Sequence, residues 1–290
     1  MCIMPFRRTM DKPRLIHNAM ENRTNDEMLQ HYQVEMELAD RLRRAHKNER
    51  RKLYASVYDE LFKRVPSHPQ LRRKASAEDS ARRVSTQMKV LKPFLQSNTV
   101  FMEVGSGDCQ LAFAVASRVQ KVYAIDVSRC ITDADHLPSN VDLIISDGVS
   151  VPVRPNTISL AYSNQVLEHL HPEDALEQLR DIHAALAPGG VYLCITPNRL
   201  SGPHDISGYF GSVPKGFHLH EYTNYEVLRI FRKAGFSHVI PYLGSKPNNQ
   251  KRGLTICEGF LSLIPAKIRR RLIRRLNLSS FSSVVALGAK

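Results

Sequence analysis

Several features that would assign this chain to a common protein class are missing from its 290 residues. The five cysteines are scattered and form no Cys-x-x-Cys pair, so the sequence indicates neither a zinc ribbon nor a disulfide framework. No apolar run approaches the length of a membrane span, and the first residues lack the apolar core of a signal peptide. These absences favour a reducing, cytoplasmic compartment.

Acidic residues are also fewer in number than basic residues. Lys and Arg number 41 against 28 Asp and Glu, which gives a formal net charge of +13. Such an excess is compatible with nucleic acid, an anionic lipid surface or an acidic substrate as the partner. The basic residues gather at 41–52, 72–74 and 267–275. A solvated helix face explains the first two clusters as well as a partner does.

One glycine-containing segment carries the strongest signal. Residues 101–109 read Phe-Met-Glu-Val-Gly-Ser-Gly-Asp-Cys. The apolar stretch 99–104 predicts a strand, the glycines predict a tight turn close to a ligand, and a helix is expected to open at Asp108. A dinucleotide-binding loop would carry a third glycine, but Gln110 stands at that place.

Further strands with polar residues at their ends are expected after this loop. The strand 121–125 ends at Asp126, about 20 residues past the glycines, where an acid can accept both ribose hydroxyls of a nucleoside. The strand 141–145 is followed by Asp147-Gly148. Both acids could instead be ordinary turn residues. The sequence then predicts a strand at 157–162, a helix at 172–186 and a strand at 191–195.

The order of these segments resembles the class I S-adenosylmethionine (SAM)-dependent methyltransferases. The loop matches their Asp/Glu-x-Gly-x-Gly motif, with Cys109 where the family often has another glycine, and "VLEHL…LAPGG…TPN" (166–198) resembles the methyltransferase type 11 branch that contains ubiquinone-biosynthesis enzymes. The resemblance covers residues 95–245. It implies SAM as cofactor and Asp147 opposite the adenine amino group. The cofactor-binding residues implied are Glu103, Gly105, Ser106, Gly107, Asp126, Val127, Asp147, Gly148 and Asn164.

The fold that the resemblance implies is α/β, a Rossmann-like, doubly wound and mostly parallel seven-stranded sheet with an N-terminal helical extension. Its last elements are expected to be a helix at 224–234, a strand at 238–243 and an antiparallel strand at 282–287. The extension would span residues 1–95, with 1–27 partly disordered. The methyltransferase domain would span 96–290, with an insertion at 244–280.

Helices are expected in the extension at 28–64 and 77–91. In this family such helices often cover the SAM pocket, although they could equally form a dimer contact. The long loop 199–217, which follows the fifth strand, is interpreted as a substrate lid.

The insertion contains a basic amphipathic helix at 264–276. Its apolar residues Ile268, Leu272, Ile273 and Leu276 share one face, and six Lys and Arg residues occupy the rest. Such a helix can make a peripheral contact with an anionic membrane. It can also cover the core with a solvated basic face.

Methyl transfer requires the two reactants to be positioned and a proton to be removed from the acceptor. The candidate catalytic residues are His169, after the fourth strand, and His218, after the long loop. If the segment 218–220 is extended, His220 lies on the same side as His218 and could replace it. Each histidine could instead make only local hydrogen bonds.

A metal site is a further hypothesis. Glu168 and His169, together with His218, resemble the metal ligands of small-RNA 3′-end ribose methyltransferases, although Gln165 replaces one carboxylate of that pattern. A divalent ion could bind acceptor oxygens and lower their pKa. The alternative is a metal-free Glu-His pair that packs at the helix entrance.

The acceptor is expected to be an oxygen of a small molecule, a glycan or a lipid-linked intermediate. The Asn/Asp-Pro-Pro-Tyr motif of many amino-group methyltransferases is missing after the fourth strand, where Ser163-Asn164-Gln165 stands. Two alternatives stay open. One is an RNA methyltransferase whose basic N-terminal helices track phosphates, and the other is a SAM-binding protein without catalytic activity.

Overall fold

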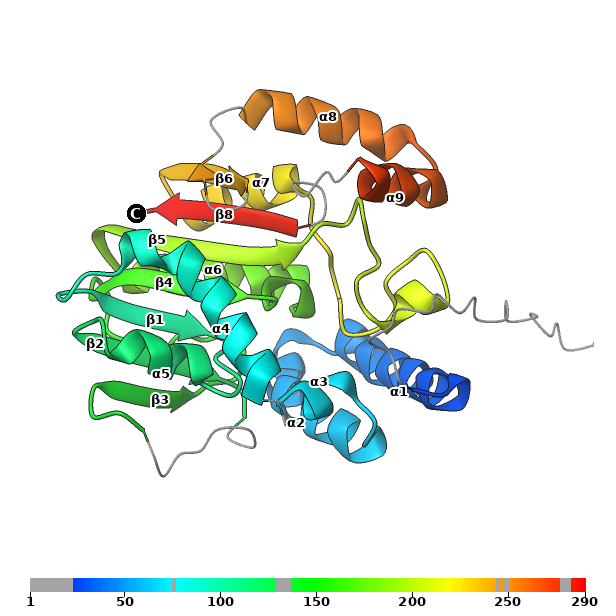
Figure 1. The fold of residues 1–290 in the computed structure, drawn as a ribbon, viewed down its shortest axis with the longest axis horizontal. Coiled ribbons are helices and arrows are strands. Elements are labelled where there is room, and N and C mark those ends of the chain that lie inside the picture. The colour runs from blue at the N-terminus through cyan, green and yellow to red at the C-terminus, as the bar shows by residue number, and fades with distance from the viewer. Residues whose placement is uncertain (1–22, 75–76, 129–136, 244–245, 248–250, 277–282) are drawn as a thin grey trace, which may run out of the picture.

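The computed structural model of the chain describes residues 23–74, 77–128, 137–243, 246–247, 251–276 and 283–290 (Figure 1). One sheet organises them, in the order β3-β2-β1-β4-β5-β8-β6-β7. Its strands are β1 (Val100–Val104), β2 (Lys121–Asp126), β3 (Val141–Ile145), β4 (Ile158–Asn164), β5 (Leu186–Pro197), β6 (His238–Leu243), β7 (Lys246–Pro247) and β8 (Ser283–Ala289).

The sheet confirms the predicted Rossmann-like class. Strands β1 to β5 are mutually parallel, and β8 lies antiparallel between β5 and β6. The two-residue β7 at the edge is an addition to the seven predicted strands. Because parallel strands point the same way, their carboxyl ends meet at one edge, where the polar residues after each strand are brought together.

Helices cover both faces of the sheet. Helices α4 (Ala77–Leu91) and α5 (Gln110–Ala116) lie on one face, and α6 (Pro172–Ala185) and α7 (Asn224–Ala234) on the other (Figure 1). Each face has its own core. Phe101 packs with α5 and its neighbour Met102 packs on the opposite side, so the strands are apolar on both faces.

Three N-terminal helices stand at the carboxyl edge of the sheet: α1 (Asn25–Arg44), α2 (Lys47–Arg64) and α3 (Pro69–Lys74) (Figure 1). Helix α1 begins inside the stretch 1–27, for which the sequence predicts partial disorder. The reason is a capping box, in which Thr24 and Glu27 bond each other's backbone N–H groups. Residues 1–22 lie outside the described part of the chain.

Helix α2 is fixed to α6 by a buried ion pair. Arg50 Nε lies 2.7 Å from Asp174 Oδ2, and the two side chains are 4% and 0% exposed. The Tyr54 hydroxyl donates to the same carboxylate oxygen (2.8 Å), and the His171 N–H donates to that hydroxyl (3.0 Å). The pair therefore determines where α2 lies above the sheet.

Two other regions refine the sequence predictions. The helix after the glycine loop begins at Gln110 and not at Asp108, because Cys109 takes a left-handed conformation with φ of 57°. That conformation suits glycine, which explains why the related family often has glycine there. The insertion forms α8 (Lys251–Leu263) and α9 (Ala266–Arg275). No helix in the described ranges is long and apolar enough to cross a membrane.

We expect Arg50→Ala to lower the free energy of unfolding by about 3–5 kcal/mol, because it leaves the Asp174 carboxylate buried without its cation. Arg44→Ala is the matched control, since its pair with Asp40 is largely exposed and should contribute less than about 1 kcal/mol. Urea denaturation measures both variants. Equal stability of the two would show that the buried pair does not hold α2 in place.

Candidate active site

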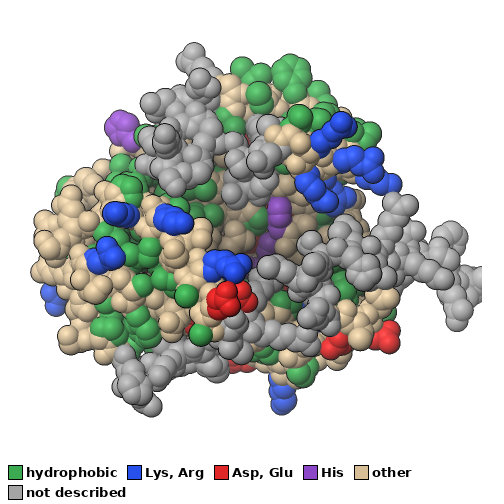
Figure 2. Space-filling model, viewed as in Figure 1, with side chains coloured by type: hydrophobic (Ala, Val, Ile, Leu, Met, Phe, Trp, Pro, Cys, Tyr) green, Lys and Arg blue, Asp and Glu red, His purple; other side chains and the backbone are tan. Residues whose placement is uncertain are grey.

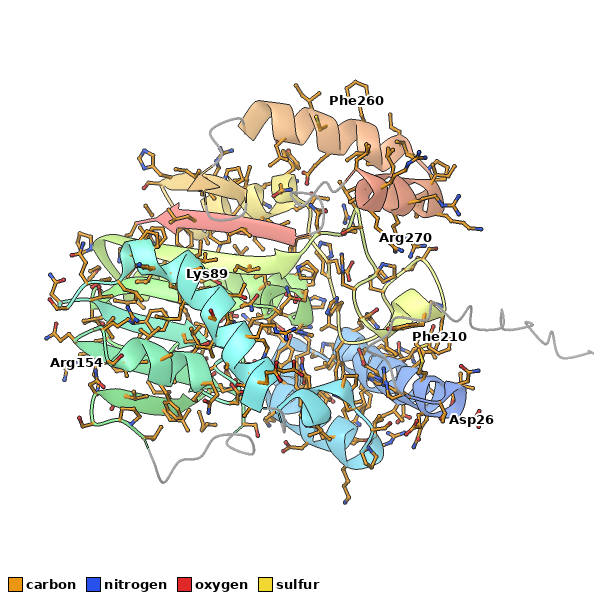
Figure 3. The ribbon with its side chains drawn as sticks, viewed as in Figure 1. Asp26, Lys89, Arg154, Phe210, Phe260 and Arg270 are labelled. Carbon is orange, nitrogen blue, oxygen red and sulfur yellow. The ribbon has the colours of Figure 1, made fainter. Side chains whose placement is uncertain are left out.

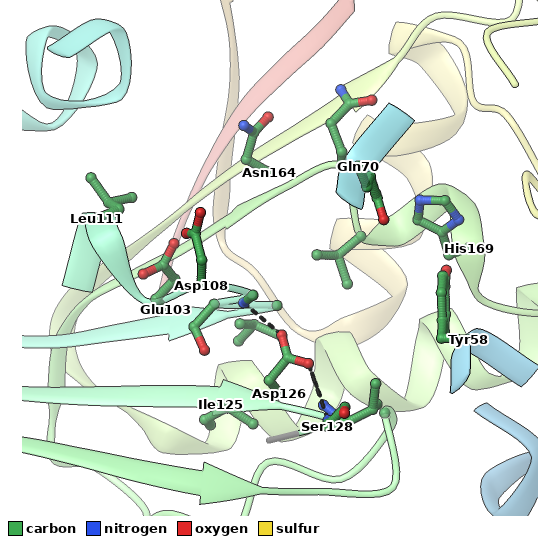
Figure 4. Close-up of a pocket in the computed structure, with 18 of the residues that line it drawn as sticks. Tyr58, Gln70, Glu103, Asp108, Leu111, Ile125, Asp126, Ser128, Asn164 and His169 are labelled. Atoms are coloured by element: carbon green, nitrogen blue, oxygen red, sulfur yellow. Dashed lines mark hydrogen bonds between the residues drawn. The ribbon is translucent and has the colours of Figure 1, made fainter. Parts of the chain in front are cut away.

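A cavity of about 630 Å³ opens at the carboxyl ends of β1, β2 and β4 (Figure 4). Its floor is the glycine loop and the residues that follow these strands. Its roof comes from α2 and α4, which contribute among others Tyr58, Phe62 and Gln87. The position is the one at which open α/β sheets bind ligands, and the volume suits a ligand of nucleoside size.

The glycine loop is held close to β2. The N–H groups of Gly105 and Ser106 both donate to the Ile125 carbonyl, at 2.8 and 3.1 Å. Gly105 has a φ of +77°, and a Cβ there would overlap the Val166 side chain. Glycine is therefore needed for two reasons, its conformation and the closeness of the neighbouring loop. Gly107 also lines the cavity, with a φ of +53°.

Asp126 lies at the cavity wall where the sequence predicts it. Its Oδ2 accepts from the Gly107 N–H (2.7 Å), and its Oδ1 accepts from the N–H groups of Val127 (2.8 Å) and Ser128 (3.2 Å) (Figure 4). Backbone donors from two loops thus orient the carboxylate toward the cavity, in the place where ribose hydroxyls would bind.

Glu103 supplies a second carboxylate to the cavity. Its side chain is buried, and Oε2 has no hydrogen-bond partner among the described residues. Burial raises the pKa of Glu103 well above its usual range, and the nearby carboxylates of Asp108 and Asp126 add to the shift. A buried acceptor without a partner calls for a donor from a ligand. The ammonium group of SAM fits this requirement.

Asp147 departs from the expected site. It does not line the cavity, whereas Val127, Gly148 and Asn164 do. Arg51 Nη1 lies 2.6 Å from Asp147 Oδ2. The N–H groups of the two residues after Gly148 occupy Oδ1, at 2.9 and 2.7 Å. The role of Asp147 opposite adenine stays a prediction, and in this structure its carboxylate is bound by an arginine of α2.

No residue of the loop 199–217, which the sequence predicts to be a substrate lid, lines the cavity. It contains the 3₁₀ turn η4 (Ile206–Tyr209), and Phe210 stacks on Tyr32 of α1 with ring centroids 4.3 Å apart. Arg43 of α1 donates to the carbonyls of Lys215 and Gly216, at 2.9 and 2.8 Å. The loop is thus fastened to α1, and α2 and α4 cover the cavity instead.

Of the two candidate catalytic histidines, only His169 lines the cavity. His218 lies behind it, with the two rings 5.0 Å apart and at 78°. The segment 218–220 is not extended, because the Leu219 N–H donates to the Phe217 carbonyl in a three-residue turn (2.9 Å). His220 therefore packs on Tyr222 and not beside His218.

The three residues predicted to hold a metal do come together. One ligand atom from each of Glu168, His169 and His218 lies within 4.8 Å of the others. Burial lowers the pKa of His169 to about 3 and also lowers that of His218. Burial raises the pKa of Glu168 to about 8. Both imidazoles are consequently neutral, the form in which histidine binds a metal.

A second buried cluster, of His31, Glu35 and His68, has comparable spacing. Its hydrogen bonds are nevertheless internal. Arg23 Nη1 donates to His31 Nδ1 (2.7 Å), and His31 Nε2 lies 2.6 Å from Glu35 Oε2. Glu35 Oε1 accepts from the Phe217 N–H (2.8 Å). With a guanidinium already present, this cluster does not call for a cation and serves to join α1 to the segment after the loop.

Comparison with known proteins finds a family model whose range includes the glycine loop. The family model described as a methyltransferase domain matches residues 101–190. No match was found among curated protein sequences. Residues 101–190 are therefore a methyltransferase domain, which supports SAM-dependent methyl transfer with SAM as the cofactor.

Solved structures with a similar chain path include three methyltransferase examples. One match is a chain from the complex of the Haloferax volcanii Trm112 methyltransferase activator with a methyltransferase. It is 16% identical to the present protein, the match covers 75% of the present protein and 95% of the matched chain, and the TM-score is 0.49. A SAM-dependent methyltransferase from Mesorhizobium loti is 15% identical (71% and 98% covered, TM-score 0.48). Phosphoethanolamine N-methyltransferase 2 of Haemonchus contortus, in complex with SAM, is 17% identical (71% and 51% covered, TM-score 0.48).

We expect Gly105→Ala to weaken SAM binding by at least about tenfold, since the added methyl group meets the Val166 side chain and a left-handed backbone costs about 1–2 kcal/mol. Gly211→Ala is the control, because a Cβ there meets no atom within 4 Å. Isothermal titration calorimetry on both folded variants gives the two affinities. An unchanged affinity in Gly105→Ala would mean that SAM does not lie against this loop.

Proposed function

We propose that this methyltransferase transfers the methyl group to an oxygen of a small-molecule, glycan or lipid-linked acceptor, and that Glu168, His169 and His218 hold a divalent metal ion beside the cavity. The observation that carries the metal site is the direction of the hydrogen bonds around it. His169 Nδ1 lies 3.1 Å from the Phe217 carbonyl oxygen. A carbonyl can only accept, so His169 carries its proton on Nδ1 and leaves Nε2 with a lone pair.

His218 also carries its proton on Nδ1. Its Nδ1 lies 2.7 Å from Glu221 Oε1, an oxygen that also accepts from the His204 N–H (2.6 Å). His218 is therefore the donor in this contact, and its Nε2 keeps a lone pair. Metal-binding histidines commonly donate their second ring N–H to a carbonyl or a carboxylate in this way.

Glu168 completes the donor set. Its Oε2 accepts from Thr196 Oγ1 (2.9 Å), whereas Oε1 is buried and has no hydrogen-bond partner among the described residues. That oxygen lies 4.0 Å from His169 Nε2. Two imidazole nitrogens and one carboxylate oxygen suit a divalent ion such as Zn²⁺ or Mn²⁺. A bound ion would lower the pKa of an acceptor hydroxyl group.

The aromatic side chains that line the cavity beside His169 support a flat, apolar acceptor. Tyr58 and Phe62 line the cavity there, and the Tyr58 hydroxyl points toward the His169 ring (Figure 4). Burial raises the pKa of Tyr58 well above its usual value, so the phenol keeps its proton and can donate to an acceptor oxygen. Two aromatic walls and one donor support an acceptor with a hydroxyl on an apolar or aromatic framework.

The structure offers little support for the RNA alternative, because four arginines of α1 and α2 are paired with carboxylates of the protein. Arg41 pairs with Glu60 (2.6 Å), Arg50 with Asp174, and Arg51 with Asp147 and Glu177. Arg64 bonds Glu37 and Glu60. Cations that are neutralised by protein carboxylates do not form a phosphate track.

Incubation of the protein with methyl-labelled SAM and fractionated cell extract tests the acceptor. We expect label in an organic-soluble or glycan fraction, on a hydroxyl oxygen that mass spectrometry of the product identifies. At a SAM concentration below its weakened Kd, Gly105→Ala should give much less labelled product, and it serves as the control for contaminating enzymes. Label on a nitrogen, or label confined to RNA, would contradict the proposed acceptor.

Binding of Mn²⁺, measured by calorimetry without acceptor, tests the metal site. Removal of a ligand in His218→Ala should weaken binding by more than about 100-fold, and Glu221→Gln should cost about 10- to 100-fold through the orientation of His218. His46→Ala is the control, because His46 is exposed and its side chain makes no capping bond. Mn²⁺ binding that survives in His218→Ala would place the ion elsewhere, without affecting the assignment of the SAM pocket.

A further inference from the structure

The helical hairpin of α8 and α9 is anchored to the protein by its inner face. Leu254 and Leu261 pack with Leu200 and with Ile273 of α9 in a small separate core. Between them Glu258 is buried, and its carboxylate accepts from the N–H groups of Asn224 and Tyr225 at the start of α7 (2.8 and 2.9 Å). Arg269 adds a bond to the Leu200 carbonyl (2.8 Å). The orientation of the hairpin is thereby determined.

The outer face of the same hairpin is apolar and uncovered. Ile256, Phe260 and Leu263 follow at helical spacing on the side of α8 opposite Leu254 and Leu261, and they are 59%, 68% and 80% exposed. The label of Phe260 in Figure 3 marks its side chain at the outer edge of α8. Ile268 and Leu276 of α9 are also exposed, whereas Ile273 is buried. We call these five side chains the apolar ridge.

The ridge stands out against the rest of the described surface. Five of the eight large hydrophobic side chains that are exposed there belong to it. Scattered exposed apolar residues are common, but a contiguous group of large ones marks a surface that binds something. Figure 2 shows this grouping as green side chains over α8, next to the blue side chains over α9.

Unpaired cations accompany the ridge on α9. Lys267, Arg271, Arg274 and Arg275 are exposed and form no ion pair within the described ranges, unlike the arginines of α1 and α2. The only acidic residue between positions 251 and 276 is the buried Glu258, against eight basic residues.

A groove between α7 and α8 extends this basic character. Its lining combines Arg229, Arg232 and Lys233 with Tyr225 and with Ile256 of the ridge. All three cations are exposed, and none forms an ion pair among the described residues. The groove thus places positive charge and an aromatic ring directly beside the apolar ridge.

We propose that this face docks the enzyme onto an anionic phospholipid bilayer, with the apolar ridge in the boundary between headgroups and acyl chains and the surrounding cations on lipid phosphates. An exposed aliphatic and aromatic ridge flanked by Lys and Arg is the chemistry that an interfacial helix requires. Nucleic acid would use the cations but gains nothing from Leu263 or Ile268. A second copy in a face-to-face dimer would bring the same arginines together and be repelled.

Co-sedimentation with phosphatidylcholine vesicles, with and without phosphatidylglycerol, tests the proposal. The unmodified protein should sediment only with the anionic vesicles and be released as salt rises. Arg271→Gln, Arg274→Gln and Arg275→Gln together should weaken binding by roughly 100-fold, at about fivefold for each cation. The control changes three exposed arginines elsewhere, Arg44, Arg118 and Arg154, to Gln, and should bind as the unmodified protein does.

The ridge itself is tested by Phe260→Ser combined with Leu263→Ser, which should weaken vesicle binding at least about tenfold at constant charge. Val213→Ser is the matched control, as an exposed hydrophobic residue outside the ridge. Unchanged SAM affinity in each variant shows that the fold is intact and separates this result from the proposed methyl transfer. Absence of vesicle binding at low salt, equal loss in the arginine control, or a dimer that the ridge variant dissociates would overturn the proposal.

Discussion

The ion pair between Arg50 and Asp174 is the contact on which the geometry of the active site depends. It is buried on both sides and fixes α2 across the start of α6. Tyr54, one turn further along α2, shares the same carboxylate and packs against Gly148 at the cavity wall. Further along α2, Tyr58 and Phe62 line the cavity. The buried ion pair therefore also fixes the position of these two side chains above the glycine loop. Removal of either partner would leave the other charge buried and unpaired, which is strongly destabilising.

A second constraint acts on the segment that carries His218. Arg43 and Glu35, both on α1, bind the backbone from Lys215 to Phe217. The Phe217 carbonyl is at the same time the acceptor for His169 Nδ1. The N-terminal helices consequently do more than cover the cavity. They position the backbone that sets the tautomer of His169, and through it the direction in which Nε2 offers its lone pair.

The arginines divide into two groups with different physical roles. Those of α1 and α2 are matched by Glu and Asp side chains, except Arg43, which binds backbone carbonyls, and they contribute to the packing of the extension. Those of α9 have no such partners in the described chain and stand beside exposed apolar side chains. Net charge alone does not separate these roles, since it counts both groups equally. The excess of positive charge is thus divided between the packed N-terminal helices and the exposed face that we propose as a bilayer contact.

Much of the predicted cofactor-binding site follows from the sequence alone, because it depends on residues that are close together in the chain. Strand ends, the two glycines and Asp126 follow from apolar periodicity and backbone freedom, and these depend on near neighbours in the chain. The turn at His218, the pairing of Asp147 with Arg51 and the attachment of the long loop to α1 depend on contacts between residues up to 182 positions apart. No sequence periodicity encodes such contacts. They arise only when the helices pack, because burial then forces each charged or polar group to find the nearest partner in space.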